Sequence, residues 1–431
     1  MTSIEETKAL APWTDTLPSE WRATRLDAVA DVIFSNVDKH TIESEVPVRL
    51  CNYVDVYKNE RITGRLDFME ASAEPREIKK FQIQRGDVLA TKDSEEADDI
   101  AIPALVAEDL PGVICGYHLA LIRPRFSTVS GPFLAWLHFS KSFRAQYEAN
   151  AVGVTRFGLS QYSFRAARVP LPPFPEQQRI AVYLDASCAA IDAAVAAKRR
   201  QIETLDALHE SITHKAITCG LIDAVELKDS GVEWLGKSPV HWPIKRIKDI
   251  VDLKSGDAIT SDSITPIGDY PVFGGNGLRG YSNSYTHDGY YALIGRQGAL
   301  CGNINYAEGK FWASEHAVVA ITLKKHDTFW LGELLRVMNL NQYSNAAAQP
   351  GLSVERIKFL RIPFPPYEEQ NRIASWLKNM TLKNEKMVSI LRDQISTLTA
   401  YRKSLIHECV TGQRRITEAD VARAHRVREV K

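Results

Sequence analysis

Apolar residues recur at alternating steps of four and three along two long segments of the chain, at 180–212 and 373–405. These steps form a heptad seam, in which the a and d positions of one helix pack against another helix. Each segment therefore predicts a helix of about 40 residues, which would be about 60 Å long. The main predicted coiled-coil seam residues are Ile180, Leu184, Ile191, Gln201, Leu205 and Ile212 in the first helix, and Ile373, Leu377, Met387, Leu391, Gln394, Leu398 and Leu405 in the second.

Before each long helix lies a block whose pattern is mostly that of strands. Short apolar or alternating runs bounded by Gly, Pro and Asp predict strands, and each block ends with one helical pattern. We therefore expect two α+β domains. The predicted strands are at 80–91 (after a turn at 86–87), 119–122, 289–294 and 318–323, and the predicted helices are at 133–149 and 330–338.

A repeat joins the two halves of the chain. Residues 170–181 (PLPPFPEQQRIA) and 363–374 (PFPPYEEQNRIA) are 193 positions apart, and Gly158-Leu159-Ser160 and Gly351-Leu352-Ser353 keep the same offset. Such a long-period repeat predicts a duplicated architecture. We divide the chain into residues 1–169 (domain 1), 170–222 (phrase and central helix), 223–362 (domain 2), 363–415 (phrase and C-terminal helix) and 416–431 (charged tail).

The connectivity of the repeat predicts how the long helices pack. The first helix carries the chain from domain 1 to domain 2 and the second returns, so the two should form an antiparallel coiled coil with pseudo-twofold symmetry. The matched seams favour this arrangement over the alternative that each helix packs only on its own domain.

Composition narrows the class of protein without assigning a function. Lys and Arg number 53, as do Asp and Glu, which argues against a histone-like binder but allows a local basic face. The six cysteines form no C-x-x-C pair, so we expect reduced, mostly buried thiols. The N-terminal residues are polar and no long apolar run is evident, so we expect no membrane span and a cytoplasmic location.

The two phrases, each ending a variable block and leading a coiled-coil helix, carry a resemblance over almost the whole chain. Residues 270–277 (YPVFGGNG) and 298–306 (GALCGNINY) add to it. The chain resembles the specificity subunit of type I restriction–modification systems. The resemblance implies that each domain reads one half of a split sequence in double-stranded DNA, through the major groove, while the helices set the unread spacer. Because the two domains differ, the site should be asymmetric.

The resemblance also implies the partners and the lack of chemistry in this chain. Such subunits are not enzymes; they assemble with two modification subunits, which are S-adenosylmethionine-dependent adenine-N6 methyltransferases, and with ATP- and magnesium-dependent restriction subunits. We therefore expect no cofactor and no metal here, and a role in phage defence through DNA methylation and restriction.

Base readout needs Arg, Lys, Asn or Gln in the groove, and backbone anchoring needs cations and hydroxyls. Lys92 and Arg296 stand at similar places after a predicted strand, as do His118 and His316 before one. For each of these residues, a solvated charge or a structural histidine remains an alternative. The predicted DNA-binding residues are Lys92, His118, Arg156 and Tyr162 in domain 1, and Asn276, Arg279, Tyr281, Arg296, Gln297 and His316 in domain 2.

Two other functions remain open on the residues alone. The domains could bind proteins instead of DNA, as a pure scaffold. A catalytic methyltransferase or nuclease is less favoured, because Pro363–Tyr367 (PFPPY) lacks the Asp or Asn of the adenine methyltransferase motif and Gly274–Gly277 lacks the G-K-[ST] ending of a phosphate loop. The bases recognised and the spacer length do not follow from the sequence.

Overall fold

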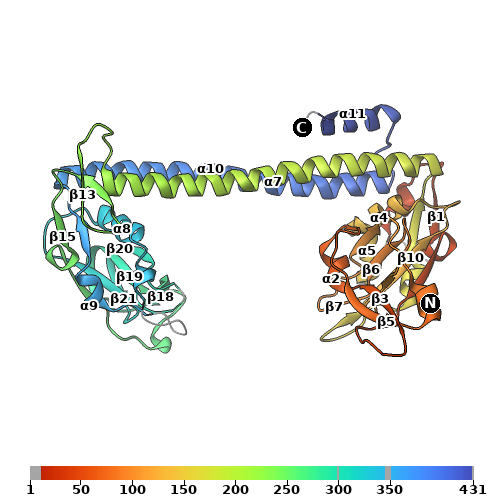
Figure 1. The fold of residues 1–431 in the computed structure, drawn as a ribbon, viewed down its shortest axis with the longest axis horizontal. Helices are drawn as coiled ribbons and strands as arrows, with labels where there is room; N and C mark the ends of the chain where they lie inside the picture. The colour runs from red at the N-terminus through yellow and green to blue at the C-terminus, as the bar shows by residue number, and fades with distance from the viewer. Residues whose placement is uncertain (1–10, 299, 345–350, 430–431) are drawn as a thin grey trace. The chain divides into compact units, whose positions relative to one another are not determined.

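The computed structural model describes residues 11–298, 300–344 and 351–429 (Figure 1). The chain divides into two compact units: unit 1 comprises Met1–Lys198 and Asp393–Lys431, and unit 2 comprises Arg199–Arg392. Each unit holds one α+β domain and half of each long helix. The division thus passes through both helices, because each half of a helix packs on the domain nearest to it.

The domain of unit 1 is built on a five-stranded sheet that separates two hydrophobic cores. Successive strand residues point to opposite faces, so Val88 and Ala90 enter the core beneath the helices, whereas Leu89 enters the core on the other face. The sheet order is β2 (Ala30–Phe34), β10 (Leu119–Pro124), β6 (Val88–Thr91), β8 (Pro103–Val106) and β4 (Arg61–Ile62), antiparallel except for β4 and β8.

Helices cover one face of this sheet, and a second small sheet covers the other together with two short helices. The predicted helix at 133–149 is two helices that meet at Ser140, and the predicted strand at 80–91 begins only at Val88. The remaining elements are η1 (Pro12–Thr16), β1 (Arg22–Arg25), η2 (Leu26–Ala28), β3 (Val46–Cys51), α2 (Tyr53–Lys58), β5 (Met69–Ala73), α3 (Pro75–Phe81), β7 (Asp93–Ser94), β9 (Val113–Cys115), α4 (Gly131–Phe139), α5 (Lys141–Glu148), β11 (Phe157–Gly158), α6 (Gln161–Ala166) and β12 (Arg168–Leu171).

The domain of unit 2 has a six-stranded sheet with the same central pattern. Ile294 and Val318 enter the core beneath the helices, and Leu293 and Val319 enter the opposite one. The sheet order is β16 (Val251–Ser255), β21 (Ala317–Thr322), β19 (His287–Gly295), β20 (Ile304–Ala313), β17 (Tyr270–Gly274) and β18 (Gly277–Ser282). The other elements are β13 (Leu227–Asp229), β14 (Lys237–Pro239), β15 (Ile244–Arg246), η3 (Ile247–Asp249), η4 (Ser261–Ser263), α8 (Thr328–Val337), η5 (Leu340–Tyr343), α9 (Val354–Lys358) and β22 (Arg361–Pro363).

The repeated phrase builds the same joint in both units. In unit 1 the buried Glu176 accepts a hydrogen bond from Trp21 Nε1 at 3.1 Å, and in unit 2 Glu369 accepts one from Trp242 Nε1 at 3.0 Å. The glutamine that follows, Gln177 or Gln370, accepts from the backbone at the start of the domain's main helix, α4 or α8. The Glu-Gln pair therefore fixes the angle at which each long helix leaves its domain.

The long helices are α7 (Phe174–Cys219) and α10 (Tyr367–Val410), and they run antiparallel within each unit. In unit 1 the start of α7 shares a core with the end of α10, through Cys188 and Leu405. In unit 2 the end of α7 shares a core with the start of α10, through Ile217 and Ile373. The α+β class and the antiparallel helix pair are thus confirmed.

The seam itself differs from the prediction in phase. Most predicted positions are buried or half-buried, but Gln201, Gln394 and Met387 are exposed, so their assignment to the seam is wrong. The next residues, Ile202, Ile395 and Val388, take the inward places. Two heptad phases, one with a step of four before three and one with a step of three before four, pass through the same shared apolar positions. Only burial against the second helix decides between them.

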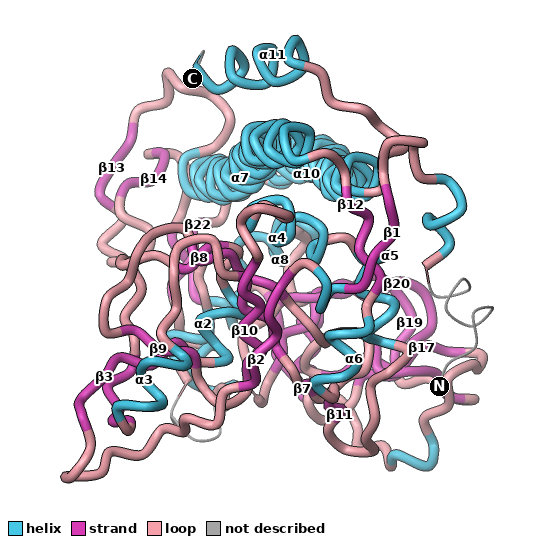
Figure 2. The backbone as a smooth tube through the Cα atoms, turned by 90° about the vertical axis from the view of Figure 1, so that its right-hand side faces the viewer, coloured by secondary structure: helices cyan, strands magenta, loops and turns pink. Residues whose placement is uncertain are grey.

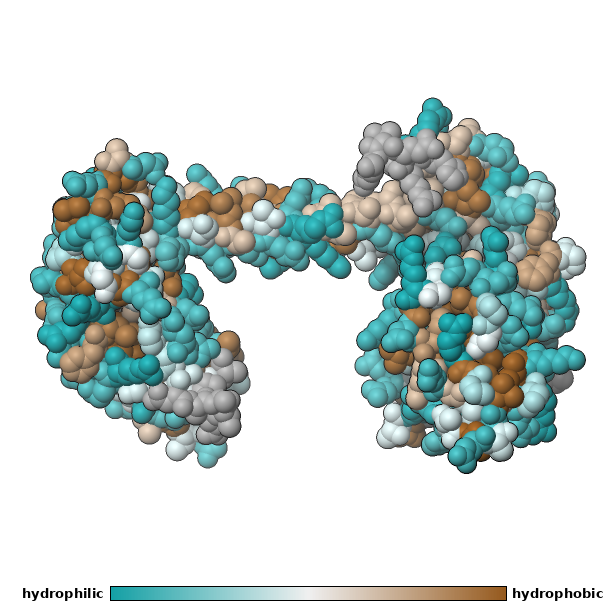
Figure 3. Space-filling view, viewed as in Figure 1, coloured by the Kyte–Doolittle hydropathy of each residue, from teal (hydrophilic) through white to brown (hydrophobic). Residues whose placement is uncertain are grey.

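The composition of one long helix bears on the expectation that the chain has no membrane span. By length and composition α7 is apolar enough to cross a membrane, contrary to the expectation from the sequence. Its alanine-rich stretch produces this result, and part of that stretch is buried against α10 and domain 1. Core helices of soluble proteins pass the same test, so this is weak evidence for a membrane span. Apolar residues are nevertheless visible on the helix pair beside the domain of unit 2 (Figure 3). Leu382, Met387 and Ile390 of α10 are among the exposed apolar residues.

Candidate nucleic-acid interface

Lys92 and Arg296 leave the two domains at equivalent places on one shared frame. The backbone N–H of Lys92 donates to the carbonyl of His118 at 3.1 Å, and that of Arg296 donates to the carbonyl of His316 at 2.9 Å. Leu159 and Leu352, from the repeated Gly-Leu-Ser, then donate to the carbonyls of Lys92 and Arg296, both at 2.9 Å. The predicted equivalence of these pairs is confirmed by identical backbone bonds.

In unit 1 the Lys92 ammonium lies over two aromatic rings. Its Nζ is 4.2 Å from the ring centroid of Tyr117 and 5.2 Å from that of Phe34. Burial lowers the pKa of Lys92, although Asp93 opposes the shift. A lysine held by cation–π contact and partly desolvated is presented in one direction instead of sampling the solvent.

Asp93 gathers the other polar groups around Lys92. Its carboxylate accepts from Arg156 Nη2 and Nε, and its second oxygen lies 2.7 Å from His118 Nδ1. The hydrogen bond to Asp93 raises the pKa of Arg156. Three predicted residues, Lys92, His118 and Arg156, are therefore brought together, whereas Tyr162 lies exposed on α6 beside the Arg25 guanidinium.

Asp93 was not among the residues predicted from the sequence, because base readout and phosphate contacts call mainly for cations and amides. The signal available in the sequence was its position directly after Lys92; the structure adds that it faces Gly158 across the β7–β11 pair. In unit 2 the equivalent backbone bridge joins Gln297 to Gly351. The same site in the frame thus carries a carboxylate in one domain and an amide in the other.

In unit 2 four predicted residues line one cleft of about 520 Å³. Asn276, Arg279, Gln297 and His316 surround it together with glycines. Gly277 has a φ of +94°, which a residue with a side chain rarely adopts, and a Cβ on Gly274 would lie 2.4 Å from Arg279 Cδ. These glycines therefore let the polar side chains approach the strand ends closely.

Two predicted residues of unit 2 lie outside this cleft. The Arg296 guanidinium turns toward β16 and donates to Ser255 Oγ at 3.1 Å. Tyr281 lies half-buried on β18, where its backbone pairs with Thr265. Ser255 was not anticipated from the sequence, because nothing in its neighbourhood marks it as a partner of an arginine 41 residues away.

Neither the cluster around Lys92 nor the cleft of unit 2 holds an arrangement for metal chemistry in the part of the chain that is described. Among residues 11–298, 300–344 and 351–429, no three His, Cys, Asp or Glu side chains lie close enough together to hold a metal ion. What both domains present instead is a cluster of hydrogen-bond donors and acceptors at strand ends, of the types that contact base edges and phosphates.

A family model for the type I restriction modification DNA specificity domain matches residues 18–204 and 239–392. The chain belongs to this family. The two matched stretches are the two halves of the repeat, and each runs from a domain through its Glu-Gln joint into a long helix. The recognition from the repeated phrase is therefore confirmed.

Two curated relatives show how this specificity-domain chain compares along its length. It is 39% identical over 152 residues to the type I restriction enzyme EcoprrI specificity subunit of Escherichia coli, a stretch covering 34% of this chain and 38% of that protein. It is 21% identical over 418 residues to the putative type I restriction enzyme MjaX specificity subunit of Methanocaldococcus jannaschii, covering 93% of this chain and 95% of the relative.

A solved structure shares the whole fold. A chain from work on complex assembly and conformational transition of the type I R-M system aligns with a TM-score of 0.74 at 18% identity, covering 91% of this specificity chain and 98% of that chain. At this identity the likeness concerns the fold, namely two α+β domains with two long helices.

Proposed function

We propose that this protein is the DNA-sequence-reading subunit of a type I restriction–modification complex, in which each domain reads one half of an asymmetric, bipartite site. The observation that carries the proposal is the pair Lys92 and Arg296, which share the same backbone bonds but stand among different side chains. Two domains that share one backbone arrangement but present different polar side chains fit a DNA site whose two halves differ in sequence.

The side chains at these ends divide the work of recognition. In domain 1, Lys92 and Arg156 supply cations for phosphates and guanine, while Asp93 and His118 hold Arg156 in place. In domain 2, Asn276, Gln297 and Arg279 supply the amides and guanidinium that pair with adenine and guanine edges in the major groove. Further contacts with DNA come from Tyr162, Tyr281 and His316. Arg296 contacts the DNA backbone.

The long helices set the unread spacer and carry the partners. Two modification subunits, which bring S-adenosylmethionine, bind the two copies of the joint and the outer faces of the helices beside them, and restriction subunits, which bring ATP and magnesium, join this complex. The chain itself performs no chemical step and works in the cytoplasm, where the DNA is.

Sequencing of N6-methyladenine in the host genome tests the proposal. A split, asymmetric motif should be methylated with this gene present and lose methylation without it. Lys92→Ala should relax the requirement in one half of the motif and Gln297→Ala in the other, each by about 1–3 kcal/mol of discrimination. A variant that changes both halves alike would contradict the assignment of one half to each domain.

A binding assay separates DNA readout from a protein–protein scaffold. Affinity for duplex DNA should fall steeply with salt, because each phosphate contact releases counterions. Lys92→Ala should lower the slope of log affinity against log salt by about 1. Affinity that is absent, or that does not respond to salt, would leave the scaffold function as the explanation.

A further inference from the structure

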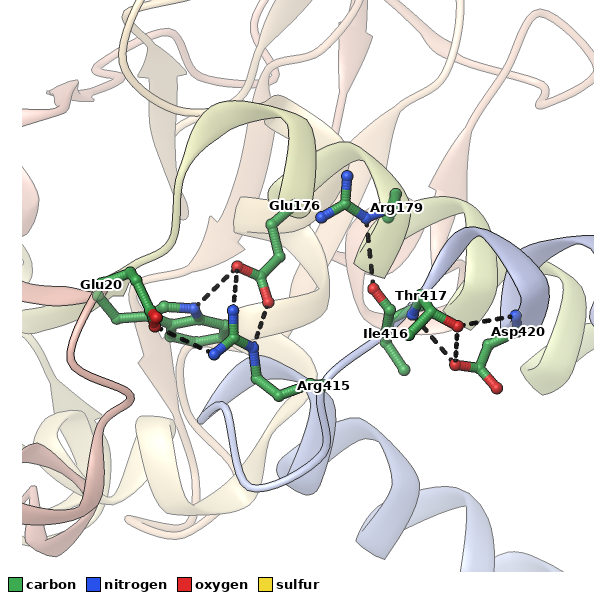
Figure 4. A network of polar contacts seen from close by, with 8 residues as sticks. Glu20, Glu176, Arg179, Arg415, Ile416, Thr417 and Asp420 are labelled. Carbon is green, nitrogen blue, oxygen red and sulfur yellow. Dashed lines mark hydrogen bonds and ion pairs between the residues drawn. The ribbon is translucent and has the colours of Figure 1, made fainter.

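The chain covers the start of α7 with its own C-terminal segment. After α10 ends, residues 411–416 turn back over domain 1 and lead into α11 (Glu418–Glu429), which runs beside the helix pair in two views (Figures 1 and 2). Arg179, from the repeated phrase, donates to the carbonyl of Ile416 at 3.3 Å (Figure 4). Its Nη1 also lies 3.4 Å from Glu418 Oε1. This face of the first long helix is therefore occupied.

The equivalent face in unit 2 is open. Arg372 lies 193 positions after Arg179 and is exposed, and no hydrogen bond or ion pair of its side chain is found among the described residues. After Gly220 the chain passes into β13 and β14 instead of a helix. The two copies of the joint thus share one scaffold, but among the described residues only the copy in unit 1 has a helix beside it and a partner for the arginine of the phrase.

The covering segment has a firmly held part and a loosely held part. Arg415 forms a two-pronged ion pair with the buried Glu176, at 2.7 and 3.1 Å, and Ile416 is buried in the core of unit 1. Beyond Thr417, in contrast, Val421 and Ala424 are the apolar side chains that pack against that core among those described, and both are half-buried, while Glu418 is 81% exposed. Residues 411–416 form a clasp, and α11 forms a strap attached to it.

We propose that α11 occupies one of two equivalent docking faces for the modification subunit, so that the two copies bind unequally. The first copy binds the open face of α10 around Arg372, and the second binds α7 only after α11 leaves, while the clasp stays in place. This inference rests on the proposed function, since it takes the modification subunit as the partner of both joints.

The strap's contacts set the size of the inequality. One exposed ion pair contributes little, and two half-buried small apolar residues contribute about as much as one buried methylene or two. We therefore expect the second copy to bind about tenfold more weakly than the first, beyond the statistical difference between identical sites, which corresponds to about 1.4 kcal/mol.

The test is a titration of the full chain with the modification subunit, in which native mass spectrometry counts the one-to-one and two-to-one complexes. A stop codon in place of Thr417 removes α11 and keeps the clasp, and should make the two binding steps statistically equal. Arg372→Glu should weaken the first step. If the two steps remain unequal after truncation, or are equal in the intact chain, the proposal that α11 blocks the second binding step is overturned.

The controls keep this result separate from the proposed function. If no variant binds the modification subunit although all melt like the intact chain and bind DNA, the assignment of the partner fails, and the strap fails with it. Limited proteolysis adds a reading without any partner: trypsin should cut at Arg423 and Arg426 well before other sites and leave Arg415 joined to the rest. If trypsin cut α11 as slowly as α10, the result would contradict the proposal that α11 leaves its face.

Discussion

Replacing Arg415 by alanine should destabilise unit 1 by removing the cation that pairs with a buried carboxylate. The side chain of Glu176 is 4% exposed and, without Arg415, keeps only the hydrogen bond from Trp21 Nε1 among the partners that the structure describes. Glu20, which also pairs with Arg415, would then add a second negative charge nearby. In unit 2 the equivalent Glu369 has His241 as its partner instead, at 3.0 Å.

The magnitude follows from burial and geometry. Breaking a fully buried ion pair costs about 3–5 kcal/mol, because the remaining charge is left without a partner. Arg415 is 46% exposed, so water and salt already screen part of the interaction. We therefore expect a loss of about 2–3 kcal/mol, which lowers the Tm of a unit of this size by about 5–10 °C.

Differential scanning calorimetry measures this loss, and matched variants identify its cause. Ile222 lies 193 positions before Arg415 and is 56% exposed, so Ile222→Ala should change the Tm by very little. Glu176→Gln in the Arg415→Ala background removes the buried charge and still accepts from Trp21, so it should restore most of the stability. A melting curve of Arg415→Ala equal to that of the intact chain, or no rescue by Glu176→Gln, would refute the reasoning.

Three further outcomes follow from single residues. Burial lowers the pKa of His138 from 6.5 to about 4. The stability that the neutral ring contributes is therefore fully present above pH 6.5 and is lost as the pH falls toward 4, up to about 3 kcal/mol. The denaturation midpoints of His138→Gln should depend less on pH in this range. In a circular-dichroism melt, Ile395→Asp should lower the stability by about 1–3 kcal/mol, whereas Gln394→Asp should lower it little. Equal losses of stability would reject the corrected seam. Gly277→Ala should lower the free energy of unfolding by about 1–3 kcal/mol, since φ is +94° and a Cβ would lie 3.1 Å from Asn305 Oδ1. In a gel-shift assay, this variant should bind more weakly to one half-site only.

Sequence reasoning worked best where a pattern repeats. The phrases at 170–181 and 363–374 identified the duplication, the family and the two long helices, because the same local contacts must be made twice. The pairing of Lys92 with Arg296 followed from that frame and is matched by their backbone bonds. Single residues inside the differing domains were harder, since no second copy exists to compare.

The amino-acid sequence by itself determined that the chain has two α+β halves on one frame and two heptad helices, because periodicity and repetition depend on neighbours along the chain. Only the tertiary structure decided which phase of the heptad faces inward, with Ile395 half-buried and Gln394 exposed. It also decided that Asp93 holds Arg156 and that Arg415 neutralises Glu176, 239 residues away. Burial and ion pairing join groups that are distant in sequence, and no local pattern specifies which of many equally spaced candidates will meet.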